Sequence, residues 1–264
     1  MTSLIKTFHD AITNSYKYRY LLKQLVLRDF KIRYKRSILG VFWSILNPTF
    51  TAIVLNIVFS TIFKNVVDNY LAYLISGLIL YSYFNESTNF AMGSVVGGSS
   101  LISKVYIPKY IFPLSKILSS AINLAASFIP LLVILIFSRI IPSWRYLAIP
   151  YVIICLMIFA LGLGFILSTL AVFFGDMQFL YSIALMMWMY FTPIMYPNSV
   201  LESRIWLLIL NPLYYYISFF RKIVLDGIIP SLTLFAGCAL FAVFFLCVGL
   251  IIFKKNQDKF VLHL

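Results

Sequence analysis

RDFKIRYKRSILGVFWSILNP, residues 28–48, joins a basic amphipathic segment to the first long apolar run of the chain. Over residues 18–36 the apolar side chains recur at i, i+3, i+4 and i+7, a spacing that gathers them on one face of a helix. That face carries Tyr18, Leu21, Leu22, Leu25, Val26 and Ile32, and the rest carries Arg19, Lys23, Arg28, Lys31 and Lys35. Such a helix lies in the lipid headgroup plane, with its cations near anionic lipid or an acidic partner. We therefore expect residues 1–36 to form a cytoplasmic interfacial segment, for which a plain membrane anchor is the alternative interpretation.

The composition is that of an integral membrane protein. Hydrophobic residues make up 62% of the chain and charged residues 11%, whereas roughly 25% of the residues in a soluble domain are charged. A net charge of +13 would indicate nucleic-acid binding only if it lay on a water-soluble domain. The apolar runs leave no stretch of sequence that could form such a domain. Cys155, Cys238 and Cys247 lie in apolar runs without CxxC spacing, so we expect them to be packing residues. The first 36 residues lack an uninterrupted apolar core, so no cleavable signal peptide is expected.

Six apolar runs are long enough to cross a bilayer. A hydrocarbon core of roughly 30 Å needs about 20 helical residues at ~1.5 Å each. The runs are residues 37–63, 70–96, 117–138, 147–174, 177–196 and 231–253. The predicted fold is therefore an all-α integral membrane protein, with six transmembrane helices in a domain that covers residues 37–264.

The distribution of Lys and Arg predicts the orientation, because cytoplasmic loops carry the excess of these residues. With the N-terminus inside, the cytoplasmic pieces carry 15 Lys or Arg and the external pieces carry six. Both chain ends are therefore expected in the cytoplasm. A seventh crossing within residues 197–230 would instead place Lys254, Lys255 and Lys259 outside.

Residues 197–230 are predicted to form an external re-entrant helical hairpin between the fifth and sixth spans. Asn211-Pro212 breaks the apolar stretch, and Arg204 and Arg221 bound it. The aromatic residues of this segment suit the outer membrane interface. They are Tyr214, Tyr215, Tyr216, Phe219 and Phe220.

The cytoplasmic connection GGSSLISKVYIPKYIFPLSK, residues 97–116, is predicted to hold a short helix. Ser99 or Ser100 is expected to cap this helix, and Pro108 and Pro113 to end it. A short basic helix between two spans is well placed to press on a partner. An ordinary interfacial loop is the alternative.

No enzyme signature is present in the sequence, which has neither a GxxxxGK[ST] phosphate loop nor an HExxH motif. Glu86 is the one carboxylate inside a predicted span, and an intramembrane carboxylate is a functional candidate. It belongs to a polar stripe of the second span, and the first span has a stripe of its own. The residues are Ser82, Asn85, Glu86, Asn89 and Gly93, and Gly40, Ser44, Asn47 and Thr51. The stripes either line a hydrated path for a hydroxyl-rich solute or hydrogen-bond to each other in a packed bundle.

The fourth and fifth spans carry two further patterns. Ala160, Gly164 and Ser168 recur at i, i+4 and i+8, which predicts a close-packing surface. Tyr181 and Trp188 share a face of the fifth span, where aromatic rings would stack on sugar rings or simply pack in a core. The candidate channel lining is therefore Ser44, Asn47, Thr51, Glu86, Tyr181 and Trp188.

Three blocks of the sequence resemble the ABC-2 type permeases that export polysaccharides such as O-antigen, capsule and teichoic acid. The first is similar to the pattern RDxxxRYxxSxLGxxWxxxxP and is carried by Arg28, Asp29, Arg33, Tyr34, Ser37, Leu39, Gly40, Trp43 and Pro48. The second, LISKVYIPKYIFPLSKILS at 101–119, resembles the cytoplasmic coupling segment of that family. The third, TPIMYP at 192–197 followed by NPLYYYISFFRKIVL at 211–225, resembles its outer re-entrant region. The chain departs from the family in having Gly175-Asp176 where relatives often have Arg-Asp.

The resemblance implies a transport subunit rather than an enzyme. Two copies would form a channel for a lipid-linked glycan in the cell inner (plasma) membrane, in contact with lipid and without nucleic acid. A separate phosphate-loop ABC ATPase dimer would hold ATP and Mg, and this chain would bind no cofactor or metal.

The resemblance also implies roles for individual residues. Coupling to the ATPase would involve Ser100, Leu101, Lys104, Val105 and Tyr106. The helix at 18–36, with its interfacial motif of Arg28, Asp29, Arg33 and Tyr34, would brace the cytoplasmic entrance. Asp29 and Arg33 are spaced i, i+4, so we expect them to pair, with Asp29 able to reach a neighbouring element.

Four other functions are alternatives for this sequence. An ABC-2 permease for a drug or a lipid would share the architecture. An ion-coupled secondary transporter would need more intramembrane ionisable groups than Glu86 and usually an internal repeat, which the sequence does not show. An intramembrane transferase would require Glu86 and Asp176 to act together with external residues, and the composition is also compatible with a stand-alone channel.

Overall fold

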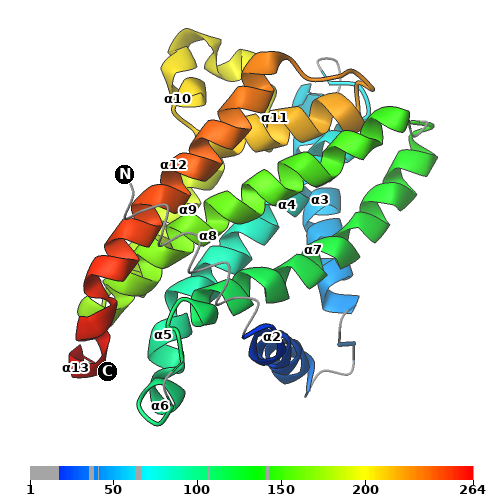
Figure 1. Cartoon of the computed structure of the whole chain (residues 1–264). Helices are drawn as coiled ribbons and strands as arrows, with labels where there is room; N and C mark the ends of the chain where they lie inside the picture. The colour runs from blue at the N-terminus through cyan, green and yellow to red at the C-terminus, as the bar shows by residue number, and fades with distance from the viewer. Residues whose placement is uncertain are drawn as a thin grey trace.

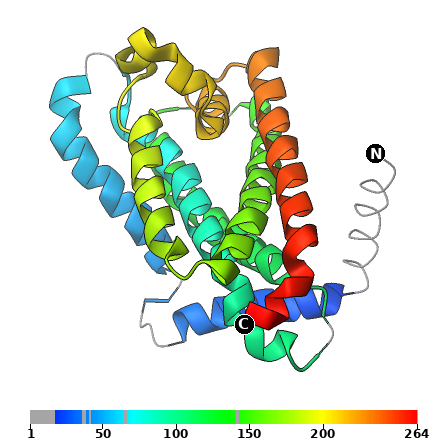
Figure 2. The same ribbon diagram turned by 90° about the vertical axis from the view of Figure 1, so that its left-hand side faces the viewer.

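The structure, a computed structural model, describes residues 18–35, 39–40, 42–63, 67–105, 107–140 and 143–263, apart from the side chains of Glu202 and Val261. Within these residues every regular element is a helix. The long helices run side by side between the same two ends of the molecule (Figures 1 and 2). They are α3 (Phe42–Phe63), α4 (Tyr70–Met92), α7 (Ile111–Phe137), α8 (Ile149–Phe173), α9 (Met177–Phe191) and α12 (Leu232–Asn256).

In the described part of the chain, four helical stretches are long and apolar enough to cross a membrane. They are Phe42–Phe63, Ile111–Phe137, Trp144–Phe173 and Leu232–Lys259. The apolar helix α9 is shorter, with 15 residues. Helix α4 has 23 residues but includes Asn85, Glu86 and Asn89, and it is not one of the four. Length and composition therefore establish a membrane protein with several apolar helices.

The shorter helices gather at the two ends of the bundle. Helix α2 (Arg19–Tyr34) lies crosswise at the lower end in Figure 2, near α5 (Ser94–Gly97), α6 (Ser99–Ile102) and α13 (Phe260–His263). At the opposite end are η2 (Asn198–Arg204), α10 (Ile205–Ile209) and α11 (Pro212–Val224). The 3-10 helix η1 (Trp144–Ala148) leads into α8, and η3 (Gln257–Lys259) connects α12 to α13.

Helix α2 uses only part of its predicted apolar face. Leu25 is buried in a small cluster with Ile102, Phe165 and Phe253, which belong to α6, α8 and α12. Ile32, which the sequence pattern placed on the same face, is 63% exposed. The reason is that the C-terminal part of α2 contacts the bundle through polar side chains instead.

Close contacts between small residues hold the centre of the bundle together. A Cβ atom on Gly162 of α8 would collide with the backbone of Phe245 and Leu246 in α12, so these two helices pack backbone to backbone. On another face of α8, Gly164 abuts Ala91 of α4, where an added Cβ would lie 2.8 Å from the Ala91 Cβ. Ala160 and Ser168 are buried on the same face, which confirms the predicted close-packing surface.

The connection between α4 and α7 differs from the prediction in two respects. Helix α6 ends at Ile102, and the residue at its N-cap position is Gly98, which has no side chain to cap it, so the expected serine cap is not formed. Helix α7 begins at Ile111 and includes Pro113 in its first turn. Proline is tolerated there because the first N–H groups of a helix have no intrahelical partner. Pro113 therefore lies inside α7 and does not end the preceding helix.

Helix α11 packs its aromatic residues inward, contrary to the expected interfacial belt. Tyr216, Phe219 and Phe220 are fully buried against the main core, because α11 lies over α4, α8 and α12 and contacts all three. The Tyr216 hydroxyl donates to the Cys238 carbonyl of α12 at 3.2 Å. Tyr214 and Tyr215 remain partly exposed on the other side of α11.

Arg221 of α11 fixes the segment that follows α9. Its guanidinium is buried and donates to the carbonyl oxygens of Pro193 at 2.6 Å, Ile194 at 3.0 Å and Tyr73 at 3.0 Å. The guanidinium carbon lies 3.4 Å from the centre of the Tyr73 ring, a cation–π contact. Burial lowers the pKa of Arg221 to about 10, so the group is still cationic at neutral pH. The TPIMYP segment is thereby tied to α4 and α11.

Candidate functional site

A cavity of about 320 Å³ lies between α2, α3, α4 and α7, at the end of the bundle where α2 crosses. Its polar lining comes from Arg33, Tyr34, Ser44, Asn47, Ser82, Glu86, Ser120, Asn123 and Ser127. Trp43 and Phe90 add aromatic surface to its walls. The cavity therefore combines two residues of the interfacial motif with three of the expected channel-lining residues, Ser44, Asn47 and Glu86.

The charged centre of the cavity is an ion pair between α2 and α4. Arg33 Nη1 donates to Glu86 Oε1 at 2.6 Å, and Asn123 Nδ2 of α7 donates to the same oxygen at 2.8 Å. The Arg33 guanidinium also lies 4.5 Å from the centre of the Phe90 ring. Both charged side chains remain partly exposed, at 22% and 31%. Arg33 is thus bonded to Glu86, which corrects the expectation that it pairs with Asp29.

Asp29 joins α2 to α7 instead. Its Oδ2 lies 2.8 Å from Lys116 Nζ, and its Oδ1 accepts a hydrogen bond from Arg28 at 3.2 Å. The Asp29 side chain is 8% exposed, whereas that of Arg28 is 52% exposed. The Asp29 carboxylate therefore interacts mainly with α7. The sequence analysis had predicted that Asp29 could reach a neighbouring element.

Tyr34 links three helices at the floor of the cavity. Its hydroxyl lies 2.6 Å from Ser44 Oγ of α3 and donates to Asn123 Oδ1 of α7 at 2.9 Å. Ser127 Oγ of α7 lies 2.9 Å from the Asn123 carbonyl oxygen of its own helix and 3.1 Å from the Ser44 carbonyl oxygen. That carbonyl lacks its usual intrahelical donor, because the residue four positions later is Pro48, which has no N–H. The proline thus leaves an acceptor that Ser127 of α7 approaches within hydrogen-bond distance.

The sequence analysis did not identify the α7 side of this cavity. Lys116, Asn123 and Ser127 each contact α2, α3 or α4. The sequence does contain a pattern that indicates this side of the cavity, because polar residues recur along one face of α7 at helical spacing. They are Ser115, Ser119, Ser120, Asn123 and Ser127.

Tyr181 and Trp188 lie elsewhere, packed in the main core. The Tyr181 hydroxyl donates to Thr88 Oγ1 at 2.6 Å, and Trp188 Nε1 donates to Asn211 Oδ1 at 2.8 Å. The Trp188 ring packs edge-on against Phe84, with 5.2 Å between ring centres. In this structure these aromatic residues and the polar stripe of α3 do not line one cavity. Thr51, one turn beyond Asn47, is also not part of the lining.

The proposed coupling residues lie at the same end of the molecule as α2 (Figure 2). Ser100, Lys104 and Val105 are exposed, and Leu101 packs on the cluster around Leu25. Tyr106 lies outside the described residues. Lys109 Nζ donates to the Gln257 carbonyl at 2.6 Å, which ties this segment to the C-terminal end of α12.

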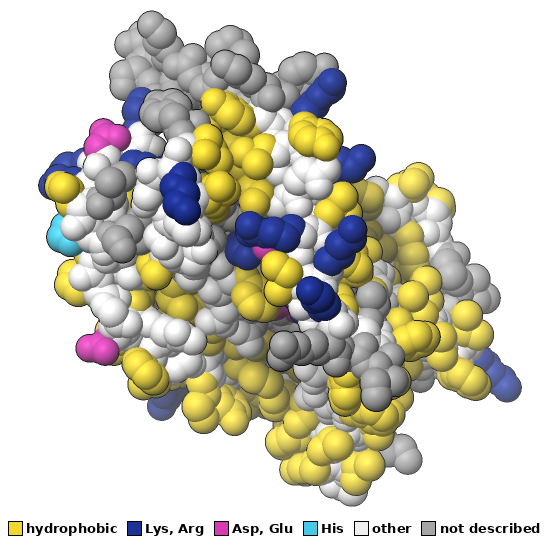
Figure 3. All heavy atoms as spheres, turned by 90° about the horizontal axis from the view of Figure 1, so that it is seen from below, with side chains coloured by type: hydrophobic (Ala, Val, Ile, Leu, Met, Phe, Trp, Pro, Cys, Tyr) yellow, Lys and Arg dark blue, Asp and Glu magenta, His cyan; other side chains and the backbone are white. Residues whose placement is uncertain are grey.

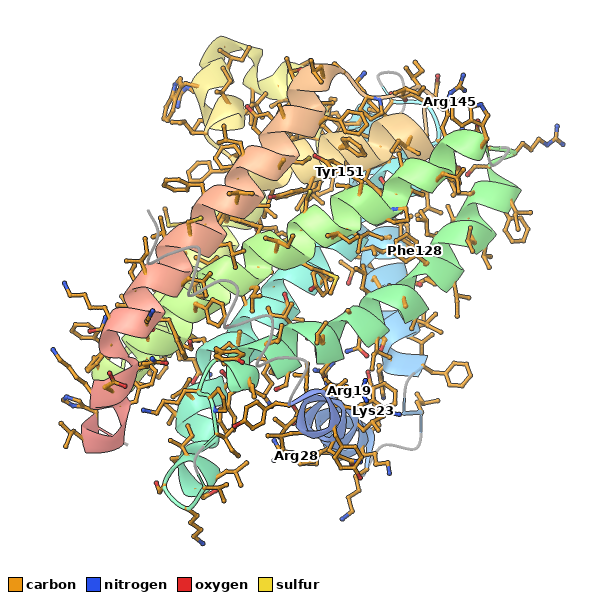
Figure 4. The ribbon with its side chains drawn as sticks, in the orientation of Figure 1. Arg19, Lys23, Arg28, Phe128, Arg145 and Tyr151 are labelled. Carbon is orange, nitrogen blue, oxygen red and sulfur yellow. The ribbon has the colours of Figure 1, made fainter. Side chains whose placement is uncertain are left out.

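This end of the molecule presents cations and apolar side chains together, as Figure 3 shows. Arg19, Lys23 and Arg28 come from α2, whereas Arg145 and Tyr151 lie toward the opposite end of the bundle (Figure 4). The described residues hold no group of three His, Cys, Asp or Glu that could bind a metal ion. The polar cavity instead offers hydroxyl, amide and charged groups, which suit hydrogen bonding to a hydroxyl-rich solute.

The sequence matches the profile of the ABC-2 type transporter family over residues 20–225. It is 30% identical over 260 residues to the "O-antigen export system permease protein RfbA" of Klebsiella pneumoniae, an alignment that covers 95% of this chain and 98% of that protein. A protein of the same name from Myxococcus xanthus is 28% identical over 93% of this chain and 95% of its own. The "Polysialic acid transport protein KpsM" of Escherichia coli is 23% identical over 90% of this chain and 93% of its own. The chain therefore belongs to the ABC-2 type transporter family.

Proposed function

We propose that this chain is the membrane-spanning subunit of an ATP-driven exporter that moves a lipid-linked polysaccharide, O-antigen-like or teichoic-acid-like, from the cytoplasmic to the external side. The observation that carries the proposal is the hydroxyl- and amide-rich cavity between α2, α3, α4 and α7. A chain that only anchors a partner has no need of such a cavity among apolar helices, where polar groups are costly. The similarity to the O-antigen permeases over nearly the whole chain supports the same function.

The proposed topology has six crossings, formed by α3, α4, α7, α8, α9 and α12. Residues 1–36 lie on the cytoplasmic surface, and residues 37–264 form the membrane domain with both chain ends inside. Residues 197–230 form the external re-entrant region. The excess of Lys and Arg in the predicted cytoplasmic pieces supports this orientation, as does the position of α2, α6 and α13 at one end (Figure 1).

The proposed assembly is a homodimer of this chain bound to two copies of an ABC ATPase in the cell inner membrane. ATP and Mg bind to the ATPase, and this chain supplies the contact through residues 97–116. Ser100, Lys104 and Val105 present the exposed surface of that contact, Leu101 anchors it to the bundle, and Tyr106 belongs to the same segment. An exposed, partly apolar and basic segment at the end of the bundle suits docking into a cleft of a second protein.

Export is tested in a strain that lacks this chain. We expect lipid-linked glycan to accumulate inside the cells and surface glycan to disappear, and the intact chain to restore export. The cavity is tested with Asn47→Leu, which we expect to lower surface glycan severalfold at equal protein level. Asn56→Leu is the matched control, because Asn56 lies on the same helix outside the cavity lining. A deletion strain with normal surface glycan and altered efflux of a drug or a lipid would overturn the proposal.

A further inference from the structure

A second cavity, of about 520 Å³, lies at the opposite end of the molecule from α2 and α6. Its lining includes Tyr73 of α4 and Asp226, which lies just beyond the end of α11. Helix α11 itself contributes Tyr214, Tyr215, Ser218 and Lys222. We call it the outer cavity. Its volume falls in the range of about 300–1,000 Å³ typical of small-ligand sites.

One face of α11 forms the floor of the outer cavity. Tyr214, Ser218 and Lys222 are spaced four residues apart and therefore form a stripe about 12 Å long on a helix that rises ~1.5 Å per residue. The opposite face, with Tyr216, Phe219 and Phe220, is buried in the core. Packing against the core thus fixes the position of α11, and α11 in turn presents Tyr214, Ser218 and Lys222 to the outer cavity.

Several polar groups of this stripe are available to a ligand. Among the residues that the structure describes, the Tyr214 hydroxyl, Ser218 Oγ and Lys222 Nζ have no hydrogen-bond or ion-pair partner. Tyr215, by contrast, is engaged, because its hydroxyl donates to the Ile209 carbonyl at 3.2 Å. The Tyr214 and Tyr215 rings meet edge to face, with 5.5 Å between ring centres.

Charges of both signs line the outer cavity, so it does not select a strongly charged ligand. Arg221 also borders it, but three backbone carbonyls and the Tyr73 ring already surround that guanidinium. The remaining charges, those of Lys222 and Asp226, have opposite sign. A carboxylate, an ammonium group and hydroxyls hydrogen-bond to sugar hydroxyls, and an aromatic ring packs against the apolar face of a sugar ring.

We infer that the outer cavity is a binding subsite for one or two neutral sugar units on the external side of the chain. The inference rests on the proposed function, since it identifies where a glycan contacts the chain after crossing. Tyr214 stacks on the sugar ring, and Ser218, Lys222 and Asp226 hold its hydroxyls.

The test measures saturation-transfer NMR on the full-length chain in lipid nanodiscs, with the neutral disaccharides mannobiose and N-acetyllactosamine as probes. We expect a signal from at least one probe, and a decrease of about fivefold to tenfold in Tyr214→Ala and in Asp226→Asn. Tyr214→Phe should retain more of the signal than Tyr214→Ala, because it keeps the ring. The control is Trp206→Ala, which removes an exposed aromatic residue at the same end outside the cavity.

Two results would overturn the inference. One is the absence of saturation transfer from either disaccharide to the wild-type chain. The other is an equal signal in wild type, Tyr214→Ala and Asp226→Asn at matched thermal stability. Failure here is distinct from failure of the proposed function: normal surface glycan without disaccharide binding refutes only the subsite, and binding in a chain that exports no glycan refutes only the export function.

Discussion

Arg33 and Glu86 form an ion pair, with 2.6 Å between Nη1 and Oε1, that joins the crosswise helix α2 to the polar stripe of α4. A carboxylate among apolar helices is stabilised when a cation and additional donors surround it, and here Arg33 and Asn123 both donate to the same oxygen. Movement of α2 away from the bundle would leave Glu86 without its cation. The pair therefore couples the position of α2 to the polar lining of the cavity.

The coupling between these two residues is measurable by a double-mutant cycle with Glu86→Gln and Arg33→Gln. Each single substitution should destabilise the chain because it leaves the partner charge unpaired, and the double variant should be less unstable than the sum predicts. We expect an interaction energy of about 0.5–3 kcal/mol. Thermal unfolding of the purified chain measures it. Strictly additive effects would show that the two side chains do not interact.

Asp29→Asn should loosen the attachment of α2 to the bundle. The substitution removes the anion that lies 2.8 Å from Lys116 Nζ, so we expect backbone amides of α2 to exchange hydrogen about tenfold faster, equivalent to ~1.4 kcal/mol. Arg28→Gln is the control, because the largely exposed Arg28 contributes little to the pair. If both variants changed the exchange of α2 equally, the Asp29–Lys116 contact would have no special role.

Gly77→Ala should displace Arg221 from its carbonyl partners. A Cβ at this position would lie 2.6 Å from Arg221 Nη2 and 3.3 Å from Ile194 Cγ2. Overpacking of this kind costs about 1–3 kcal/mol, and residues 192–197 should lose protection from hydrogen exchange. Gly93→Ala, in the same stretch of chain, meets no atom within 4 Å and should leave protection unchanged. Normal protection of residues 192–197 in Gly77→Ala would contradict the proposed role of Arg221.

Trp188→Ala should destabilise the chain by about 3 kcal/mol, because it removes a ring packed in the core. Trp188→Phe should cost only ~1 kcal/mol, since it loses the hydrogen bond to Asn211 but keeps most of the packing. Trp144→Ala, at a 69% exposed position, is the control. Thermal unfolding separates these effects from transport. A Trp188→Ala chain of normal stability that fails to export glycan would instead support the predicted channel-lining role of Trp188.

Lys104→Glu should uncouple transport from ATP hydrolysis. The side chain is exposed on the segment proposed to contact the ATPase, and reversal of a charge at an interface opposes docking. We expect transport per ATP hydrolysed to fall on the order of tenfold, equivalent to ~1.4 kcal/mol of coupling. Lys255→Glu, also exposed at the same end of the molecule, serves as the control. Unchanged transport in a reconstituted complex that contains Lys104→Glu would remove this residue from the contact.

The sequence by itself determined the features that depend on local pattern and length. The apolar runs predicted a helical membrane protein, and the period of residues 18–36 predicted the helix that became α2. The spacing of Ala160, Gly164 and Ser168 predicted a packing surface that the structure forms. The three sequence blocks pointed to the ABC-2 family, to which the chain belongs. These features follow from helical periodicity and side-chain size, which are properties of neighbouring residues.

Only the tertiary structure decided which distant groups meet. It assigned Arg33 to Glu86 and Asp29 to Lys116, although i, i+4 spacing favoured a bond between Asp29 and Arg33. It also placed Tyr181 and Trp188 in the core and Tyr214 at the outer cavity, although all three are aromatic residues on apolar helices. The physical reason is that a charged or aromatic side chain is stabilised by whichever partner the packing of whole helices brings within a few ångströms. That packing depends on the shape of every helix at once.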